Sequence, residues 1–158
     1  MTEFTHLDDE GNAVMVDVSA KENTKRFATA KGAVLMAPKT LELIKDGRLK
    51  KGDVLSVAQL AGIMAAKKTS ELVPLCHPLG LSSVQVNLNC DLETSSVNIT
   101  ATCKLTGKTG VEMEALTAVT VSALTVYDMC KSVDRSMQLS DIRLVHKSGG
   151  KSGVYKSD

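Results

Sequence analysis

Two runs of strictly alternating residues restrict the fold of this chain more than any other feature. Apolar residues take every second place from Val84 to Leu92, and again from Val97 to Leu105. A period of two is that of a β-strand with one buried face. The four residues between the runs, 93–96, form a connection short enough for a hairpin. The sequence therefore predicts two antiparallel strands that bury the same face.

Two long helices are predicted on either side of this hairpin. Residues 54–68 are rich in Ala, Leu and Met and contain no proline, and Asp53 before them is a good N-cap. A second helix is predicted over residues 110–133. Its apolar residues recur at steps of three and four: Leu116, Val119, Ala123, Val126, Cys130 and Val133. A second apolar row, Val121 and Leu124, lies elsewhere on this helix, so we expect the helix to contact other subunits as well.

The remaining elements complete an α+β fold. A strand is predicted over residues 24–36, and a short helix follows it, with Pro38 in its first turn and Gly47 past its end. A last strand is predicted over residues 138–147. The order strand, helix, strand, strand, helix, strand is that of the ferredoxin-like split βαβ unit, with an antiparallel sheet and helices on one face. We expect one domain over residues 1–158, with a mobile N-terminal segment and a mobile Gly- and Ser-rich C-terminal tail.

Composition argues against a nucleic-acid partner. The chain has 19 Lys and Arg against 18 Asp and Glu, so its net charge is +1 and it carries no chain-wide basic footprint. An RNA-binding module of the same fold is the first alternative, but such a module displays aromatic residues on its sheet. The predicted strands here present Gln, Asn and Thr. We therefore expect no nucleic acid to bind.

The N-terminal sequence and the cysteines indicate a cytoplasmic protein. The opening residues, MTEFTHLDDEGN, are polar and acidic, unlike a secretory or mitochondrial leader. The longest apolar stretch, residues 54–66, is interrupted by polar residues and is too short to span a bilayer. The four cysteines form no CxxC pair and no zinc-ligand spacing. We expect no membrane association, no metal site and no cofactor.

The first candidate segment for chemistry is LVPLCHPLGLSS, residues 72–83. Pro74 and Pro78 fix their own φ angles and favour extended geometry in the residues before them. Neighbouring side chains on an extended chain point in opposite directions, so a nucleophilic dyad of Cys76 and His77 is not expected. A purely structural loop with a hydrogen-bonded histidine remains the alternative.

The second candidate segment is LTGKTGVEMEALTA, residues 105–118. Glu112 and Glu114 fall in the first helical turn, where acidic residues complement the helix dipole without any further function. Gly107-Lys108-Thr109 lacks the earlier glycine of a phosphate-binding P-loop.

The third candidate is the pair Asp128 and Lys131, which are neighbours on one helix face. An ordinary surface ion pair is the alternative, although an acid and a lysine on an apolar row suggest a partly buried proton relay. Glu114 and Asp128 are fourteen residues apart, about 21 Å along a helix axis. If both serve one site, the cleft must be long or two subunits must contribute. Lysines near the candidate segments favour a phosphorylated small molecule: Lys50, Lys51, Lys67, Lys68, Lys131, Lys147 and Lys151.

Taken together, these segments resemble a known family. ELVPLCHPL, KLTGKTGVEMEALTA, ALTVYDMCK and LVHKSGGKSG, with the opening THLDDEGNAVMVDVSAK, are similar to the molybdenum cofactor biosynthesis protein C family over nearly the whole chain. The resemblance implies a single catalytic domain with lyase activity. Its substrate would be a cyclised dihydroguanosine triphosphate, and its products cyclic pyranopterin monophosphate and diphosphate. It also implies a ferredoxin-like fold and a homohexamer, built as a trimer of dimers, with substrate at the dimer interface.

The resemblance also implies roles for single residues. Asp128 would be the catalytic acid and base, with Lys51 and Lys131 as essential lysines. The substrate contacts would be Leu75, Cys76, His77, Met113 and Glu114, with Arg26, Glu112 and Lys147 lining the same pocket. Magnesium could accompany the triphosphate. A small-molecule regulatory module of this fold is the second alternative, and it would bind the nucleotide without releasing diphosphate.

Overall fold

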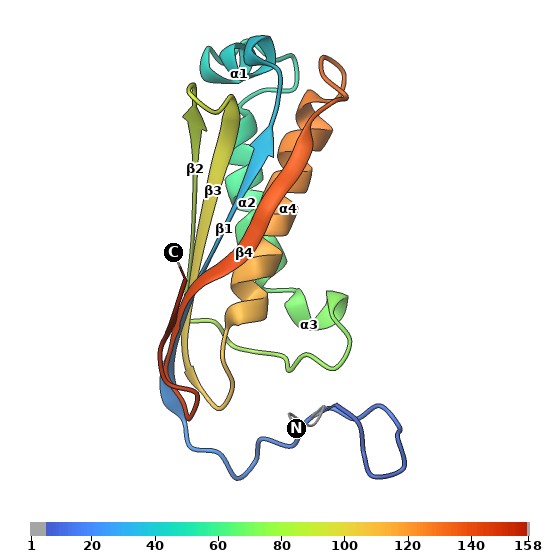
Figure 1. Ribbon diagram of the computed structural model, residues 1–158, viewed down its shortest axis with the longest axis vertical. Helices are drawn as coiled ribbons and strands as arrows, with labels where there is room; N and C mark the ends of the chain where they lie inside the picture. The colour runs from blue at the N-terminus through green and yellow to red at the C-terminus, as the bar shows by residue number, and fades with distance from the viewer. Residues whose placement is uncertain (1–5, 158) are drawn as a thin grey trace.

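The computed structural model describes residues 6–157 and contains a five-stranded antiparallel sheet (Figure 1). The strands are β1 (Thr24–Leu35), β2 (Ser83–Asp91), β3 (Ser96–Gly107), β4 (Gln138–Ser148) and β5 (Tyr155–Lys156). Their order across the sheet is β2-β3-β1-β4-β5. The first four strands have the order of the ferredoxin-like split βαβ unit, and both crossovers run through helices. The predicted fold class is confirmed.

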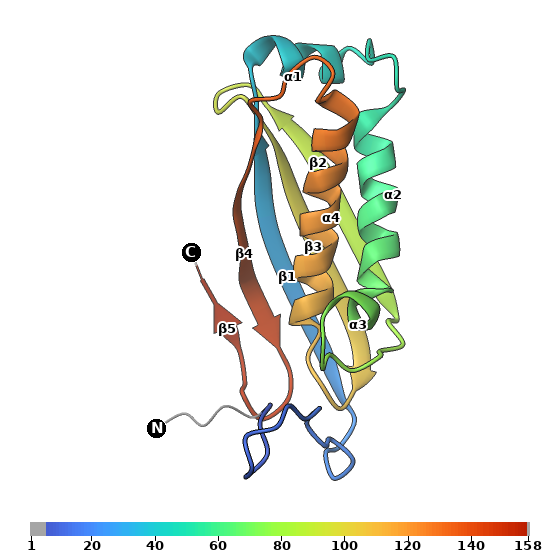
Figure 2. The ribbon, with the colours of Figure 1, turned by 90° about the vertical axis from the view of Figure 1, so that its right-hand side faces the viewer.

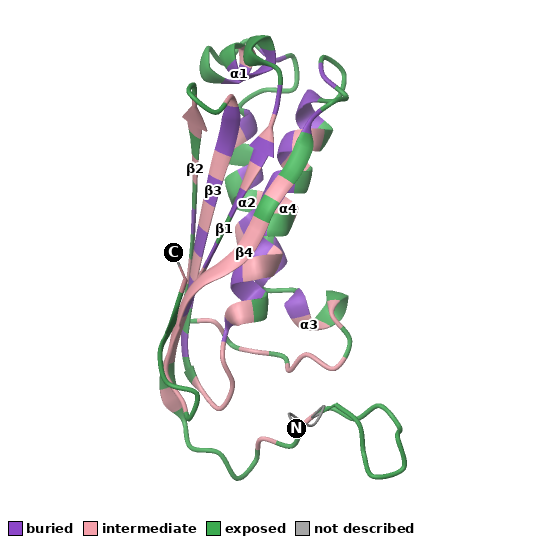
Figure 3. Ribbon diagram, in the orientation of Figure 1, coloured by how far each residue is buried: buried purple, intermediate pink, exposed green. Residues whose placement is uncertain are grey.

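The predicted hairpin forms the β2–β3 edge of the sheet. Val86 faces Ala101 and Cys90 faces Val97 across the strand pair. Val86, Val97 and Ala101 are buried, whereas the polar residues between them are half-buried or exposed. The alternation therefore correctly predicted which face the hairpin buries, and that face lies under the helices (Figure 3).

Two long helices, α2 (Val54–Ala66) and α4 (Glu112–Cys130), cover one face of this sheet (Figure 2). Asp53 caps α2 as predicted, because its side chain accepts a hydrogen bond from Ser56 N at 3.0 Å. The two helices touch at Gly62, where a Cβ atom would overlap Ser122 Oγ and lie 2.9 Å from Ala118 O. A small residue at this place lets the two backbones approach closely.

The second apolar row of α4, Val121 and Leu124, was expected to contact other subunits, and a single chain does not test that expectation. Together with α2, α4 forms an outward-facing apolar surface. Leu124 on α4 is 56% exposed, and Val57, Leu60 and Met64 on α2 are exposed as well.

A short helix, α1 (Pro38–Lys45), lies at one end of the sheet, and it begins at Pro38 as predicted. Its N-cap residue, Ala37, offers no side-chain cap, and the cap comes from Asp134 in the α4–β4 loop instead. Asp134 Oδ2 accepts hydrogen bonds from Ala37 N at 2.9 Å and from Thr40 Oγ1 at 3.1 Å. Asp134 Oδ1 accepts from Ser136 N at 2.9 Å and from Ser136 Oγ at 2.6 Å. One buried carboxylate thus joins α1 to the end of α4.

Two elements were not predicted. A single turn, α3 (Thr69–Leu72), follows α2, and β5 forms within the C-terminal tail. In β5, Tyr155 pairs with Lys147 and Lys156 pairs with His146 of β4. The predicted mobile N-terminal segment begins with residues 1–5, which lie outside the described residues. Between residues 6 and 157, no helix has the length and apolar character needed to cross a membrane.

Candidate active site

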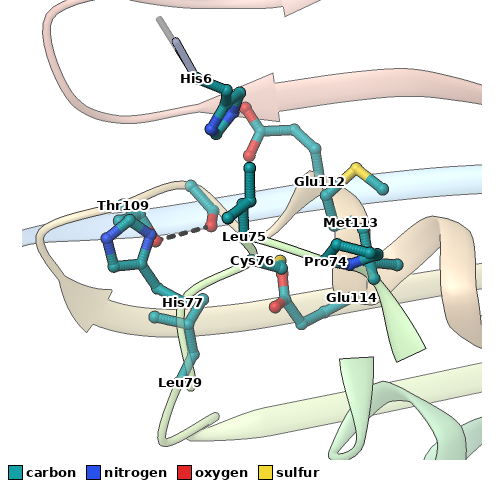
Figure 4. Close-up of a pocket in the computed structure, with 12 residues that line it drawn as sticks. His6, Pro74, Leu75, Cys76, His77, Leu79, Thr109, Glu112, Met113 and Glu114 are labelled. Carbon is teal, nitrogen blue, oxygen red and sulfur yellow. Dashed lines mark hydrogen bonds between the residues drawn. The ribbon is translucent and has the colours of Figure 1, made fainter. Parts of the chain in front are cut away.

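A cavity of about 300 Å³ lies at the N-terminal end of α4 (Figure 4). Two segments supply most of its wall: the loop of residues 73–79, and residues 109–114, where α4 begins. Five predicted substrate contacts line it: Leu75, Cys76, His77, Met113 and Glu114. The structure therefore brings together residues from two segments that lie more than thirty positions apart in the sequence.

The 73–79 loop differs from the extended chain expected from its prolines. Leu75 has a φ of 64°, in the left-handed region, and Cys76 N donates a hydrogen bond to Val73 O at 3.3 Å. The loop therefore makes a turn at Leu75, and the prediction of a continuous extended segment was wrong there. A branched side chain seldom adopts this conformation, which costs energy and is concentrated at functional sites.

Cys76 and His77 nevertheless point apart, as expected. The Cys76 sulfur lies beside the Glu114 carboxyl group, and the His77 ring extends away from it (Figure 4). His77 Nε2 is 2.7 Å from Val16 O, and because a carbonyl only accepts, the ring nitrogen donates. Burial raises the pKa of the Cys76 thiol, and the nearby Glu114 charge raises it further. Cys76 is therefore a protonated thiol at neutral pH.

Glu114 is the most unusual acid of this cavity. It is only 3% exposed, and burial raises the pKa of its carboxyl group, with a further contribution from the charge of Glu112. Over residues 6–157, no lysine, arginine or histidine forms an ion pair with it. A buried carboxyl group without a counter-charge is costly unless a ligand supplies hydrogen-bond donors.

A second cavity, of about 900 Å³, adjoins the first. Arg26, Glu112 and Lys147, the three predicted pocket residues, all line it. Lys147 Nζ forms an ion pair with Glu112 Oε1 at 2.8 Å and donates a hydrogen bond to Ser152 Oγ at 2.8 Å. Both cavities share Thr109, Gly110 and Glu112, so an elongated ligand could occupy the two together.

The predicted catalytic residues form a separate cluster at the C-terminal end of α4. Lys131 Nζ lies 2.6 Å from Asp128 Oδ1, and Lys51 Nζ lies 3.5 Å from Asp128 Oδ2. Lys51 Nζ also donates to the backbone oxygen of Asp128 at 2.9 Å. The hydrogen bond from Lys131 and the charges of both lysines lower the pKa of the Asp128 carboxyl group.

The Asp128–Lys131 pair is more exposed than expected. Within one chain the two side chains are 57% and 52% exposed, so the expected partly buried pair is not formed by a single subunit. The apolar row that motivated the expectation includes Leu124, which also faces outward. An exposed ion pair of this kind adds little to stability. Stability therefore does not explain why Lys51, from the loop before α2, also lies beside Asp128.

A single chain therefore divides the predicted site residues between the two ends of α4. Glu114 and Asp128 both lie on this helix, fourteen residues apart, which corresponds to about 21 Å. The first end holds the two adjoining cavities, and the second holds the Asp128 cluster. Two groups so far apart cannot act on one reacting atom from one subunit.

Some residues of the cavities escaped the sequence analysis. His6, Thr109 and Gly110 line the first cavity, and Lys21 and Lys108 line the second. Lys108 and Thr109 carried a signal, because they stand between two glycines immediately before a helix. These two residues were set aside because the segment does not match a P-loop. Among residues 6–157, no group of three His, Cys, Asp or Glu side chains is arranged to hold a metal ion.

Comparison with known proteins identifies the family. The model of the MoaC family matches residues 15–150. A cyclic pyranopterin monophosphate synthase of Rhodospirillum rubrum is 66% identical over 152 residues, which cover 96% of this chain and 92% of that protein. A protein of the same name from Dinoroseobacter shibae is 60% identical, over 100% of this chain and 100% of that protein. Another from Pelotomaculum thermopropionicum is also 60% identical, over 99% of this chain and 92% of that protein. The chain belongs to the MoaC family.

Proposed function

We propose that this chain carries out the cyclic pyranopterin monophosphate synthase reaction at a site completed by two subunits. The reaction is a lyase step of molybdenum cofactor biosynthesis, and its substrate is a cyclised dihydroguanosine triphosphate. The products are cyclic pyranopterin monophosphate and diphosphate. The family match and the names of the relatives support the reaction. The division of the site residues between the two ends of α4 supports the shared site.

The first cavity would hold the purine-derived ring of the substrate. Leu75 and Met113 supply apolar walls, and Glu114 supplies a buried carboxyl group. A guanine-type edge presents adjacent N–H donors, which a carboxylate can accept. Binding would therefore satisfy the polar group that the free protein leaves buried. Cys76 and His77 would contact the ring without attacking it.

The Asp128 cluster of a second subunit would supply proton transfer. The two lysines lower the pKa of Asp128, so its carboxyl group is ionised at neutral pH and its first step is to accept a proton. The protonated carboxyl group can then return that proton as the ring is rebuilt. Lys51 and Lys131 keep the cluster net positive and stabilise negative charge that develops on phosphate oxygens in the transition state.

The proposed assembly is a homohexamer, a trimer of dimers, in the cytoplasm. Its support is the outward-facing apolar surface of α2 and α4, which is formed by Val57, Leu60, Met64 and Leu124. Large apolar side chains grouped on adjacent helices are typical of a covered surface. A covering subunit would also reduce the exposure of the Asp128 cluster, which lies on the same helix as Leu124.

Complementation between inactive variants tests the shared site directly. Asp128→Asn and Glu114→Gln should each abolish most turnover as homo-oligomers. In a two-fold dimer, a mixed pair would carry one site with both defects and one intact site. Random co-expression makes about half of the dimers mixed, so about one quarter of wild-type diphosphate release should return. Mixing Asp128→Asn with Lys131→Ala is the control, because both defects lie at the same end of α4 and neither site would be intact.

Three outcomes would contradict this proposal. Absence of recovered activity in the Asp128→Asn and Glu114→Gln mixture would mean that both residues serve one site within a single chain, or none. A monomer with full activity, detected by light scattering, would reject the shared site. Binding of the cyclised nucleotide without diphosphate release by the wild-type protein would favour the regulatory alternative.

A further inference from the structure

We propose that Asp134 is a positioning residue for the Asp128 cluster: it ties α1 to the end of α4 and thereby holds Lys51 beside Asp128. The inference rests on the proposed function, because it gives Asp134 a role in the chemistry of Asp128. It also goes beyond that function, because Asp134 lines neither cavity and is not among the predicted site residues.

Lys51 reaches Asp128 from a different part of the chain. It lies in the loop of residues 46–53, between α1 and α2. Lys51 Nζ donates to Asp128 O at 2.9 Å and lies 3.5 Å from Asp128 Oδ2. The Lys51 side chain is 46% exposed, and an exposed ion pair is too weak to hold two segments in place. The position of this loop must therefore be fixed by other contacts.

The loop that carries Lys51 is joined closely to α1. Arg48 N donates a hydrogen bond to Leu43 O at 3.1 Å, across the end of the helix. Gly52 N donates to Leu49 O at 3.1 Å and closes a second turn around Lys51. Because these turns leave little freedom between the helix and the lysine, a displacement of α1 would move Lys51 with it.

α1 depends on Asp134 for its own position. It has only eight residues, and helices of this length are marginal without outside contacts. Its N-cap residue, Ala37, offers no side chain to the free N–H groups of the first turn. Asp134 Oδ2 takes that place and accepts from Ala37 N at 2.9 Å and from Thr40 Oγ1 at 3.1 Å. This carboxylate therefore fixes where α1 begins.

Asp134 is also attached to the end of α4. Asp134 N donates to Cys130 O at 3.1 Å and closes the turn that contains Lys131. Figure 2 shows the α4–β4 loop next to α1. Burial and the charge of Asp134 raise the pKa of the Cys130 thiol to about 11, and the charge of Lys51 acts on it in the opposite direction. Both charges therefore lie near one buried side chain. Asp134 thus joins α1 to the helix end that carries Asp128.

Loss of this tether has a defined effect on Asp128. The hydrogen bond and charge of Lys131, and then the charge of Lys51, lower the pKa of Asp128. Within residues 6–157, these lysines are the only charged side chains that shift it. Lys131 follows α4 directly and stays in place when α1 moves, whereas Lys51 is drawn away. The pKa of Asp128 then rises, so the acid limb of turnover moves to higher pH. Asp134 itself has a pKa of about 2 and stays ionised over this range.

Two substitutions at hydroxyl groups that donate to the same carboxylate test the tether. Thr40→Val removes the hydroxyl that donates to Asp134 Oδ2 from α1. Ser136→Ala removes the hydroxyl that donates to Asp134 Oδ1 from within the α4–β4 loop. Each variant leaves one backbone N–H on its oxygen, so the two losses of hydrogen bonding are matched. Only the Thr40 bond connects Asp134 to α1.

The two variants should differ in turnover. Thr40→Val should lower kcat for diphosphate release at pH 7 by about 10-fold, because small displacements of a catalytic group are costly. It should change KM less than about 2-fold, because both cavities are intact. Its acid limb should rise by about 0.5 pH unit, the size expected for two exposed unit charges near 4 Å. Ser136→Ala should keep most of the wild-type kcat and the wild-type acid limb. Thr40→Ser retains the hydroxyl and should restore both.

A second variant keeps the test decisive if Thr40→Val does not fold. Ala37→Pro removes the backbone N–H that donates to Asp134, and the φ angle of Ala37 is −63°, the value that proline requires. Circular dichroism and light scattering verify fold and assembly. The proposal is overturned if a folded α1-side variant keeps wild-type turnover, if its acid limb does not move, or if Ser136→Ala loses as much turnover.

Wild-type turnover separates this inference from the proposed function. If wild type and Thr40→Val release diphosphate equally while Asp128→Asn does not, the tether is wrong and the function stands. If wild type releases no diphosphate, the function is wrong, and a crystal structure of Thr40→Val tests the tether by itself. Lys51 Nζ should then lie farther than about 4 Å, the limit of an ion pair, from both carboxylate oxygens of Asp128. An unchanged separation of 3.5 Å would overturn the tether.

Discussion

Replacing Asp134 with asparagine should destabilise this protein more than any other substitution of one acidic residue by its amide. The Asp134 carboxylate is 7% exposed and accepts four hydrogen bonds, two on each oxygen. An asparagine keeps one accepting oxygen but turns an NH2 group toward donors on the other side. Two hydrogen bonds to a charged acceptor are then lost, and buried donors are left without partners. We expect the free energy of unfolding at pH 7 to fall by about 2–4 kcal/mol.

The ionisation of Asp134 gives an independent magnitude for the same effect. The hydrogen bonds from Ser136, from Ala37 N and from Thr40 lower the pKa of Asp134 from 3.8 to about 2. A shift of this size corresponds to roughly 2 kcal/mol between the charged and neutral forms, after allowance for solvent screening. Because the folded-state pKa is the lower one, the stabilisation is complete well above pH 3.8 and is lost as the pH falls toward 2. About half of it should be gone at pH 3.

Urea unfolding followed by circular dichroism measures both effects. Wild type and Asp134→Asn are compared at pH 7 and at pH 3, at one protein concentration, because subunit association makes stability depend on concentration. The difference between them should shrink by roughly 1 kcal/mol at the lower pH. Asp46→Asn, which breaks an exposed pair with Arg48, is the control and should cost less than about 0.5 kcal/mol. An Asp134→Asn variant that matches this control, or whose deficit is the same at both pH values, would refute the capping argument.

Three further predictions concern the site and the helix contact. Asp128→Asn should cut turnover by at least about 100-fold, and Lys131→Ala should cut it by a similar factor. The double variant should be little slower than either single variant, because the two residues act as a unit. Near-normal turnover in a folded Asp128→Asn variant would reject the catalytic role of Asp128. Cys76→Ser should keep measurable turnover, because the thiol stays protonated at neutral pH, and a covalent adduct on Cys76 seen by mass spectrometry would contradict this. Gly62→Ala should lower the free energy of unfolding by about 1–3 kcal/mol, because α2 and α4 touch at this residue. Gly80→Ala is the control and should not lower it, because a Cβ atom there meets no atom within 4 Å. Equal stabilities of the two variants would show that the helices separate easily.

Periodicity predicted most of the fold, because it records which face of an element is buried. The alternation in residues 84–92 and 97–105 identified the hairpin, and the Asp53 cap identified the start of α2. Sequence periodicity did not predict elements whose formation depends on residues distant in the sequence. β5 has only two residues and forms because β4 offers its edge to Tyr155 and Lys156. The same holds for the cap of α1, since Asp134 lies almost one hundred residues from Ala37.

The candidate site residues came from the resemblance, and their arrangement came from the structure. The order of the motifs pointed to the Leu75–His77 and Met113–Glu114 segments, which do line one cavity. No pattern indicated the left-handed conformation of Leu75, which is rare for any residue other than glycine. Nor did any pattern place Lys108 and Lys147 in the wall of one cavity. Side chains from separate strands and loops meet there only after the sheet has formed.

The central place of β1 in the sheet has a consequence for how the chain folds. Thr24 pairs with Gly107 and Leu35 with Ser96, and β4, the other neighbour of β1, lies still later in the chain. Apart from the two-residue β5, which pairs with β4 just before it, only β2 and β3 pair with a sequence neighbour, so among the longer strands this hairpin alone can form before large loops have closed. The entropy cost of closing such loops must be met before the contacts between distant segments stabilise the chain, and this slows folding. We therefore expect refolding in milliseconds to seconds, with the hairpin formed in the transition state and β1 inserted between its two partners late.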